Sequence, residues 1–256
     1  MSYETILIGV ENGVATITLN RPEVMNGLNA AMRREIVRAV AEGAEQARAL
    51  VLTGAGPAFC AGQDLGEATD DLDFQRILRE EYEPMIQAIA RCPVPTIAAV
   101  NGVAAGAGAN LALAADLVIA AQTASFIQAF TRIGLVPDAG GSYWLPRQIG
   151  FPRAMGAALL AEKIMATEAA AWGMIWEAVP DIDFAARVAA RARTLAEGPS
   201  TAYRLTKTAM RASLANGLEA QLALEAELQG EAGRTRDFRE GIAAFLEKRA
   251  ARFEGR

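Results

Sequence analysis

Two glycine-rich stretches contain the residues of this chain that are best suited to chemistry. The first is residues 59–65 (FCAGQDL) and the second is residues 101–110 (NGVAAGAGAN). A backbone N–H approaches a ligand oxygen closely only where side chains do not crowd it, so glycine and alanine suit a site that binds negative charge developing on oxygen. The alternative is that these residues serve tight turns and close helix packing. Nucleotide-binding loops are excluded, because Leu111 stands where a third dinucleotide-binding glycine belongs and neither stretch ends in Gly-Lys-Ser/Thr.

The chain contains no histidine among its 256 residues. Catalysis by Ser-His-Asp or Cys-His groups, zinc binding through histidine and proton transfer through imidazole are therefore excluded. Acid–base work falls to carboxylates, lysine, tyrosine or cysteine. Cys60 and Cys92 are too few for a disulfide framework or a four-cysteine metal site. We therefore expect a metal-free protein of the reducing cytoplasm.

The overall charge argues against two classes of partner. The net charge is −5 and the isoelectric point is near 5.1, which disfavours nucleic acid and anionic membrane surfaces. Residues 92–115 are uncharged over a length that would cross a bilayer, but prolines, glycines and asparagines interrupt them. We interpret this segment as a buried strand, a loop and a helix, and we expect neither a nucleic-acid nor a membrane partner.

The elements that must position the glycine-rich stretches follow from periodicity and turn signals. Residues 5–10 and 14–19 are apolar, β-branched runs joined by Asn12-Gly13, a pair favoured in type I′ turns, so they predict a β-hairpin. Apolar residues at three-to-four spacing predict a helix over residues 29–46, and a short buried strand follows at 49–53. The pattern continues with a helix over 78–90, a strand over 95–100, a helix entered at the second glycine-rich stretch and a strand over 116–120. This order favours an α/β fold with parallel strands.

The last part of the chain has a different character. Residues 202–215, 218–229 and 237–249 are typical of helices, with no strand between them. Asp237 followed by Glu240 predicts a capping box for the last helix. We therefore divide the chain into a core, residues 1–200, which holds the substrate site, and a helical region, residues 201–256, which packs on the core or on another subunit.

Four motifs occur together in this chain: NRP at residues 20–22, FCAGQD at 59–64, the glycine-rich residues 102–110 and GLVPDAGG at 134–141. In order and spacing they resemble the enoyl-CoA hydratase/isomerase (crotonase) superfamily, and the resemblance covers essentially the whole chain. It implies a crotonase-like spiral of repeated ββα units with a C-terminal helical region. It also implies an acyl-CoA thioester as substrate, no separate cofactor, and the backbone N–H groups of Gln63 and Ala107 as the oxyanion donors.

The same resemblance indicates which group moves the proton. Hydratases of the superfamily carry two glutamates where this chain has Asn110 and Phe130, and neither side chain exchanges a proton usefully at neutral pH. Isomerase-like members use an aspartate after the proline of the last motif, which is Asp138 here. Apolar neighbours such as Phe130 and Val136 are expected to raise the pKa of that carboxyl. The alternatives are that Asp138 belongs to a simple surface turn, and that Asn110 either positions substrate or water or caps the start of its helix.

The resemblance also implies which residues surround coenzyme A and how subunits assemble. Val24, Met25 and the Ala61 carbonyl are expected beside the adenine and pantetheine. Phe245 and Lys248 are expected near the nucleotide of the same or a neighbouring subunit. The expected assembly is a homotrimer or a dimer of trimers, and the helical region is expected to close the CoA pocket. As alternatives, Phe245 is a core residue of an amphipathic helix and Lys248 a solvated charge. The other expected binding residues are Gln63, Asp64, Leu65, Ala107 and Phe130, with Asp64 mainly stabilising its own loop.

These residues together favour an acyl-CoA isomerase that acts through an enolate. Two substrates fit. One is a ring epoxide of phenylacetyl-CoA, because the resemblance to isomerases of that substrate extends through residues 141–147, 153–156, 172–176 and 238–241. The other is a 3-enoyl-CoA whose double bond moves to the 2 position. An enoyl-CoA hydratase is one alternative, and a non-catalytic acyl-CoA-binding subunit is another. The carboxylate-rich segment at residues 67–73 is a candidate cover for the acyl pocket.

Overall fold

The structure is a computed structural model that describes residues 3–67 and 73–256. Most of the carboxylate-rich segment proposed as a pocket cover, residues 68–72, lies outside the described residues. The chain opens with the expected hairpin of β1 (Ile6–Glu11) and β2 (Val14–Leu19), which pair antiparallel. Asn12 and Gly13 between them have φ of 51° and 75°, the positive values that a type I′ turn requires.

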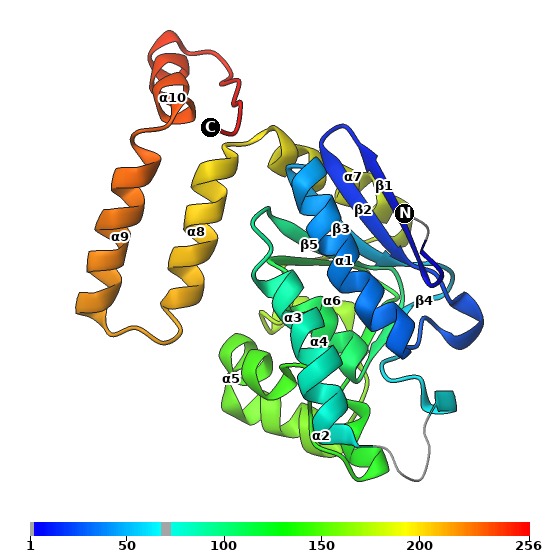
Figure 1. Ribbon diagram of the computed structural model, residues 1–256. Helices are drawn as coiled ribbons and strands as arrows, with labels where there is room; N and C mark the ends of the chain where they lie inside the picture. Colours follow the sequence, from blue (N-terminus) through cyan, green and yellow to red (C-terminus); the bar gives the residue numbers. More distant parts are fainter. Residues whose placement is uncertain (1–2, 68–72) are drawn as a thin grey trace.

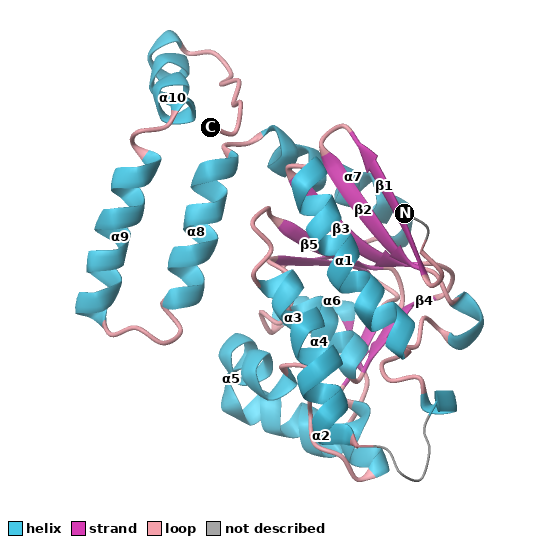
Figure 2. Cartoon of the chain, viewed as in Figure 1, coloured by secondary structure: helices cyan, strands magenta, loops and turns pink. Residues whose placement is uncertain are grey.

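After the opening hairpin, successive strands from β3 to β8 alternate between two sheets, and this alternation makes the chain a spiral. The larger sheet has the order β1-β2-β3-β5-β7-β10 and the smaller one the order β4-β6-β8-β9; both are magenta in Figure 2. Strands β2, β3, β5, β7 and β10 run parallel. The pairs β3–β4, β5–β6 and β7–β8 each give one strand to each sheet and then continue into a helical segment, which confirms the crotonase-like ββα architecture. The further strands are β3 (Ala49–Gly54), β4 (Ala58–Cys60), β5 (Thr96–Val100), β6 (Val103–Ala105), β7 (Leu117–Ala121), β8 (Ser125–Ile127), β9 (Ile164–Met165) and β10 (Glu177–Val179).

Helices cover both faces of the larger sheet, so its central strands are apolar on both sides. Leu50 and Leu52 of β3 belong to the core cluster beneath α1, whereas Val51 between them packs toward Val188 of α7. The predicted helix at residues 29–46 is confirmed, with the Asn29 side chain accepting the N–H of Met32 as its cap. The helices of the core are α1 (Ala30–Gln46), α2 (Phe74–Ile77), α3 (Glu83–Ala90), α4 (Ala107–Leu113), α5 (Gly141–Leu160), α6 (Ala166–Ala171) and α7 (Asp181–Glu197).

Short helical turns connect several of these elements. The 3₁₀ turns are η1 (Pro22–Val24), η2 (Leu65–Glu67) and η4 (Ala129–Ile133), and a π-helical turn, η3 (Leu78–Tyr82), joins α2 to α3. The uncharged residues 92–115 form β5 and α4, as interpreted from the sequence, and the expected loop between them contains the short strand β6. Among the described residues, no helix is both long enough and apolar enough to cross a membrane.

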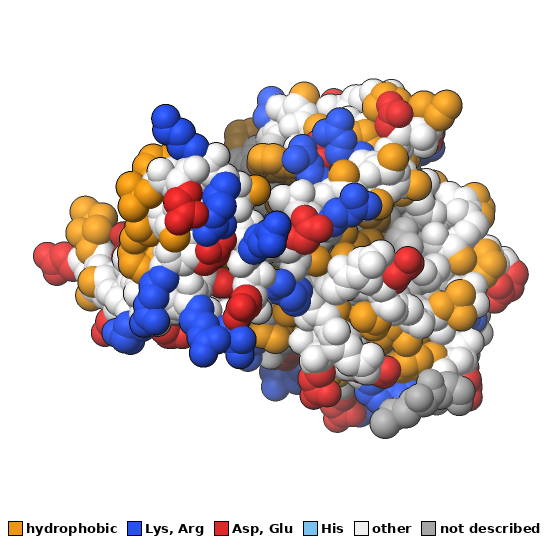
Figure 3. Space-filling model, turned by 90° about the horizontal axis from the view of Figure 1, so that it is seen from above, with side chains coloured by type: hydrophobic (Ala, Val, Ile, Leu, Met, Phe, Trp, Pro, Cys, Tyr) orange, Lys and Arg blue, Asp and Glu red, His pale blue; other side chains and the backbone are white. Residues whose placement is uncertain are grey.

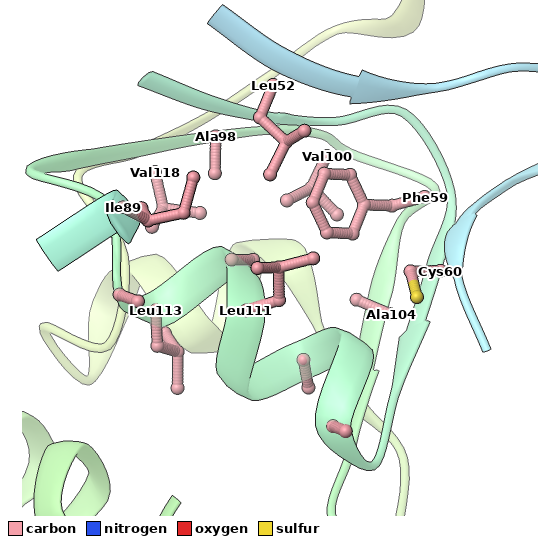
Figure 4. Packing of buried hydrophobic residues seen from close by; sticks show 14 of the residues in the cluster. Leu52, Phe59, Cys60, Ile89, Ala98, Val100, Ala104, Leu111, Leu113 and Val118 are labelled. Carbon is pink, nitrogen blue, oxygen red and sulfur yellow. The ribbon is translucent and has the colours of Figure 1, made fainter. Parts of the chain in front are cut away.

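Helix α4 is packed on all sides in the centre of the molecule. All of its residues are buried, and Leu111 and Leu113 belong to the main core cluster. Figure 4 shows Leu111 beneath the strand residues Leu52, Val100 and Phe59. The tight packing fixes the position of the helix, and therefore of its first residue, relative to strand β4.

The C-terminal helices form an arm beside this core (Figure 1). They are α8 (Ser200–Ala212), α9 (Leu218–Ala232) and α10 (Arg236–Glu247). Lys207 and Arg211 of α8 form ion pairs of 2.6 and 2.9 Å with Asp116 at the start of β7, which tie the arm to the sheet. Apolar side chains of α9 and α10, among them Leu218 and Phe245, are exposed, and hydrophobic groups are visible over the arm in Figure 3.

The predicted capping box of the last helix is wrong. The cap is Thr235, whose hydroxyl accepts the N–H of Phe238. Asp237 is instead buried, and its carboxylate accepts the N–H groups of Glu254 and Gly255 from the returning C-terminal segment. The side chain is therefore used for a tertiary contact that the local sequence does not reveal.

Candidate active site

A cavity of about 230 Å³ lies where the two glycine-rich stretches and the loop before α5 meet. Its walls include Gln63 from the first stretch, Ala107 from the second and Asp138 from the loop. The structure therefore brings together three residues that are far apart in the sequence and that were predicted to act together. Most of the remaining wall is apolar: Leu65, Phe74, Ile77, Leu78, Phe130, Ile133 and Leu135.

The backbone N–H groups of Gln63 and Ala107 are both free to bind a ligand. Ala107 is the first residue of α4, so its N–H has no partner within the helix. Neither N–H donates a hydrogen bond to any of the residues that the structure describes. Two unpaired donors at the wall of one cavity form a candidate oxyanion hole.

Glycines allow the two stretches to approach each other. A Cβ atom at Gly62, whose φ is +92°, would lie 2.7 Å from the carbonyl oxygen of Ala105 and 3.3 Å from the nitrogen of Ala107. A Cβ atom at Gly108 would lie 2.3 Å from the carbonyl oxygen of Cys60. Any other residue at these two positions would push the stretches apart, so close approach is what the glycine pattern provides.

Asp138 is the carboxylate in the wall of the cavity that Gln63 and Ala107 line. It follows η4 in a loop where Ala139 and Gly140 both have positive φ. Its Oδ1 is buried without a hydrogen-bond partner among the described residues, and burial raises the pKa of the carboxyl from 3.8 to about 6. The predicted direction of this shift is confirmed. A carboxyl with such a pKa is a capable proton acceptor near neutral pH.

Asn110 does not cap its helix, because the cap position of α4 is Gly106. The side chain is completely buried inside α4, where its Nδ2 donates to the carbonyl oxygen of Asp138 at 2.7 Å. Its Oδ1 accepts from Gln128 at 2.9 Å. Both ends of the amide are therefore bound to the protein, and Asn110 holds the Asp138 loop against α4.

An ion pair and a backbone hydrogen bond hold the first glycine-rich stretch against the turn that precedes α1. Asp64 forms an ion pair of 2.7 Å with Arg21, and the hydrogen bond from Arg21 lowers the pKa of the Asp64 carboxyl. The N–H of Ala61 donates to the carbonyl oxygen of Met25 at 2.9 Å, so Ala61 lies beside Met25 and its neighbour Val24. These contacts agree with a loop-stabilising role for Asp64.

Two of the expected CoA-binding residues lie elsewhere in the chain. Phe245 is 83% exposed on α10, and it lines a separate cavity of about 440 Å³ between α8, α9 and α10. Lys248 follows as the C-cap of α10. Neither residue lines the cavity of Gln63, Ala107 and Asp138, so the structure of one chain does not bring them to the candidate site.

Cys60 is not a reactive group of the site. The residue is fully buried, and burial raises the pKa of its thiol to about 12. Its Sγ donates to the carbonyl oxygen of Asn26. Cys60 is a small packing residue of the first glycine-rich stretch, beside Ala104 in Figure 4.

Sequence reasoning missed Arg33, Glu81 and Tyr82. Arg33 on α1 is 2% exposed, and its guanidinium pairs with Glu81 at 2.7 Å. Tyr82 lines the cavity and donates its hydroxyl to Oε1 of Gln63. No local signal marks these residues, because their side-chain partners are 19 to 49 positions away in the chain.

Comparison with known proteins identifies the class to which this fold and site belong. A family model described as enoyl-CoA hydratase/isomerase matches residues 9–256. The chain therefore belongs to the enoyl-CoA hydratase/isomerase family, and an acyl-CoA substrate is consistent with that membership.

Individual relatives carry two kinds of name. A Rhodobacter capsulatus protein named "Probable enoyl-CoA hydratase" is 64% identical to this chain, and the match covers 100% of both chains. The 1,2-epoxyphenylacetyl-CoA isomerase of Escherichia coli is 46% identical, over 99% of each chain. The crystal structure of an enoyl-CoA hydratase from Bacillus anthracis superposes with a TM-score of 0.92 at 32% identity, covering 99% of this chain and 100% of that one.

Proposed function

We propose that this protein is an acyl-CoA isomerase that acts through a thioester enolate. One observation carries the proposal: a single cavity is lined by Gln63 and Ala107, whose N–H groups have no partner among the described residues, and by a carboxyl whose pKa is raised to about 6. The donors bind negative charge on a thioester oxygen, and the carboxylate removes the proton whose loss creates that charge. These are the two parts that enolate chemistry needs.

The proposed reaction of a 3-enoyl-CoA has two proton transfers. The Asp138 carboxylate takes a proton from C2, and the C–H electron pair moves toward the thioester oxygen to give a dienolate. The N–H groups of Gln63 and Ala107 stabilise that oxygen, and one such donor contributes about 3 kcal/mol. The Asp138 carboxyl then returns the proton to C4, which leaves the double bond between C2 and C3. No cofactor takes part beyond the coenzyme A of the substrate.

The composition of the cavity wall favours isomerisation over water addition. Asp138 is the only carboxylate among the described residues that line the cavity. Water addition by a glutamate pair needs one group to activate water and a second to deliver a proton. Asn110 and Phe130 occupy the two positions where a resemblance to hydratases places glutamates, and Asn110 is already bound to Asp138 and Gln128.

Two acyl groups are candidates for this site. The 46% identical relative is named a 1,2-epoxyphenylacetyl-CoA isomerase, which supports a ring epoxide as the acyl group. Asp138 would then promote rearrangement of the epoxide to an oxepin. The largely apolar wall also suits an unsaturated fatty acyl chain. Enoyl-CoA hydration is the second candidate function, because the 64% identical relative is named a probable enoyl-CoA hydratase.

The test is turnover of a 3-enoyl-CoA by the purified protein and by Asp138→Asn, with binding of the ester measured separately by calorimetry. We expect the variant to bind the ester and to lose at least about a hundredfold in turnover, the usual contribution of a positioned acid–base group. Equal turnover by the two proteins would refute the role of Asp138. Tight binding without turnover of either candidate substrate would make the protein an acyl-CoA-binding subunit, and hydration of a 2-enoyl-CoA would favour the second function.

We further propose that the active assembly is a homotrimer or a dimer of trimers in the cytoplasm. Two observations support a model in which α10 reaches the CoA site of a neighbouring subunit. Apolar residues of the arm are exposed, and Phe245 and Lys248 do not line the Gln63–Ala107–Asp138 cavity of their own chain. Cys60 and Cys92 are both free and buried, which agrees with a reducing compartment. Sedimentation of the protein with and without residues 236–256 would test the assembly.

A further inference from the structure

The side chain of Gln63 is held by two donors from different parts of the fold. Its Oε1 accepts from the hydroxyl of Tyr82 and from Nη1 of Arg33, the latter at 3.1 Å. Its Nε2 donates to the carbonyl oxygen of Asp64 at 3.3 Å. All three polar contacts lie within the protein, so the side chain of Gln63 is anchored and leaves its backbone N–H for the ligand.

Arg33 also braces the backbone on which the Gln63 N–H lies. Nη1 of Arg33 donates to the carbonyl oxygen of Leu28 at 2.6 Å, and the N–H of Leu28 donates to the carbonyl oxygen of Gly62 at 2.7 Å. That carbonyl belongs to the same planar peptide group as the N–H of Gln63. Holding the oxygen therefore fixes the direction in which the N–H points.

The π-helical turn η3 brings both of its last residues into this network. Glu81 accepts from Nε and Nη2 of Arg33, at 3.0 and 2.7 Å, while the neighbouring Tyr82 reaches Gln63. The Arg33 guanidinium carbon also lies 4.8 Å from the centre of the Tyr82 ring. Single π-helical turns within helices are frequent at functional sites, and this one forms part of the cavity wall through Leu78 and Tyr82.

We propose that Arg33 and Tyr82 are positioning residues that set the Gln63 N–H for the oxyanion. Tyr82 acts through the side chain of Gln63, and Arg33 acts through both that side chain and Leu28. The inference rests on the proposed function, because it assigns Gln63 N–H to the oxyanion. Neither residue touches the reacting atoms in this scheme, so their loss weakens binding of the charged state more than binding of the neutral ester.

The test uses acetoacetyl-CoA, a 3-oxoacyl thioester that ionises to an enolate with its own ultraviolet absorbance. The enolate fraction of the bound ligand is measured at pH 8, where Asp138 is ionised, for the wild type, Tyr82→Phe, Gln63→Leu and the double variant. Tyr3→Phe is the matched control, since its hydroxyl donates to Glu42 far from the cavity. Arg33→Lys and Arg33→Met are compared in the same assay, because lysine keeps the charge beside Glu81.

We expect Tyr82→Phe to lower the enolate-to-keto ratio of the bound ligand about fivefold, the worth of one ordinary hydrogen bond, with total ligand affinity changed less. The control should leave the ratio unchanged. The double variant should be little worse than Gln63→Leu alone, because both substitutions remove the Tyr82–Gln63 hydrogen bond and Tyr82→Phe removes besides it only the long 3.5 Å contact from Arg33 Nη1 to the Tyr82 hydroxyl. Arg33→Lys should recover part of the loss seen in Arg33→Met.

The inference would be overturned, while the proposed function stands, by either of two results. One is an enolate-to-keto ratio that Tyr82→Phe leaves unchanged; the other is a double variant whose ratio falls by the product of the two single-variant losses. A wild type that stabilises the enolate but does not isomerise any ester would end the proposed function, and the ratios would still decide the roles of Arg33 and Tyr82. A wild type that binds no acyl-CoA would refute both. Circular dichroism of each variant confirms that it is folded.

Discussion

Asp138→Asn should make the folded protein more stable while it removes activity. The buried carboxyl has a pKa of about 6 instead of 3.8, and burial is the cause. One pKa unit corresponds to 1.36 kcal/mol, so the ionised form costs the folded state up to about 3 kcal/mol. Asparagine carries no charge at any pH, and replacing the carboxylate by it relieves this cost.

The sign and the pH window of this effect follow from the two pKa values. Below about pH 3.8 the carboxyl is protonated in both the folded and the unfolded chain, so wild type and variant should differ little. Between pH 3.8 and about 6 the unfolded chain loses the proton first, and the wild type becomes progressively less stable relative to the variant. Above pH 6 the difference should remain constant at its largest value.

Urea unfolding at fixed protein concentration, followed from pH 4.5 to pH 8, measures this difference directly. Asp183→Asn is the control, because Asp183 is an exposed aspartate on α7 and carries the same chemical change without burial. A free-energy difference between wild type and Asp138→Asn that is small at pH 4.5 and grows to a plateau supports the argument. The same difference at every pH would show that the carboxyl is not destabilised by burial, and the reasoning would fail.

Three further predictions follow from the site. The value of kcat/KM for isomerisation should rise with pH through an apparent pKa of about 6, because Asp138 must be ionised to accept a proton; a flat profile from pH 5 to 7.5 would contradict this. Gly108→Ala should lower the free energy of unfolding by about 1–3 kcal/mol, since its Cβ would lie 2.3 Å from the Cys60 carbonyl oxygen. Gly156→Ala should cost nothing, because its Cβ would meet no heavy atom of the described residues within 4 Å apart from its own helix backbone; equal urea midpoints for the two variants would refute the packing argument. Asn110→Leu should lower kcat more than it raises KM, because it removes the hydrogen bond to the Asp138 carbonyl, and it should lower the free energy of unfolding by about 1–3 kcal/mol, because it leaves the Gln128 amide unpaired. Unaltered steady-state kinetics would show that the Asp138 loop does not need the hydrogen bond from Asn110.

Local sequence patterns were sufficient to predict those elements whose structure depends on interactions between nearby residues. The Asn12-Gly13 turn and the helix capped by Asn29 are set by residues within a few positions of each other, and both were predicted correctly. The capping box at Asp237 failed for the opposite reason. Its pattern was correct, but the chain returns to the helix start and offers two N–H groups that bind the carboxylate.

The candidate site was predictable to the extent that it depends on motifs. The glycine-rich stretches and the GLVPDAGG motif led to Gln63, Ala107 and Asp138, which share one cavity. The residues that hold them were not predictable, because Arg33 looks like a surface charge until its partner Glu81, on another helical segment, is known. Buried charges of this kind depend on pairing across the fold, which periodicity does not report.

The two halves of the proposed chemistry are joined through one short helix. Ala107, the first residue of α4, carries one of the proposed oxyanion donors, and Asn110 in the same helix holds the carbonyl of Asp138. Any movement of α4 therefore carries the donor and the base together, and the separation between them is preserved. An enolate forms only while proton removal and charge stabilisation act on one substrate at once, so packing α4 on all sides in the core maintains the geometry on which the proposed reaction depends.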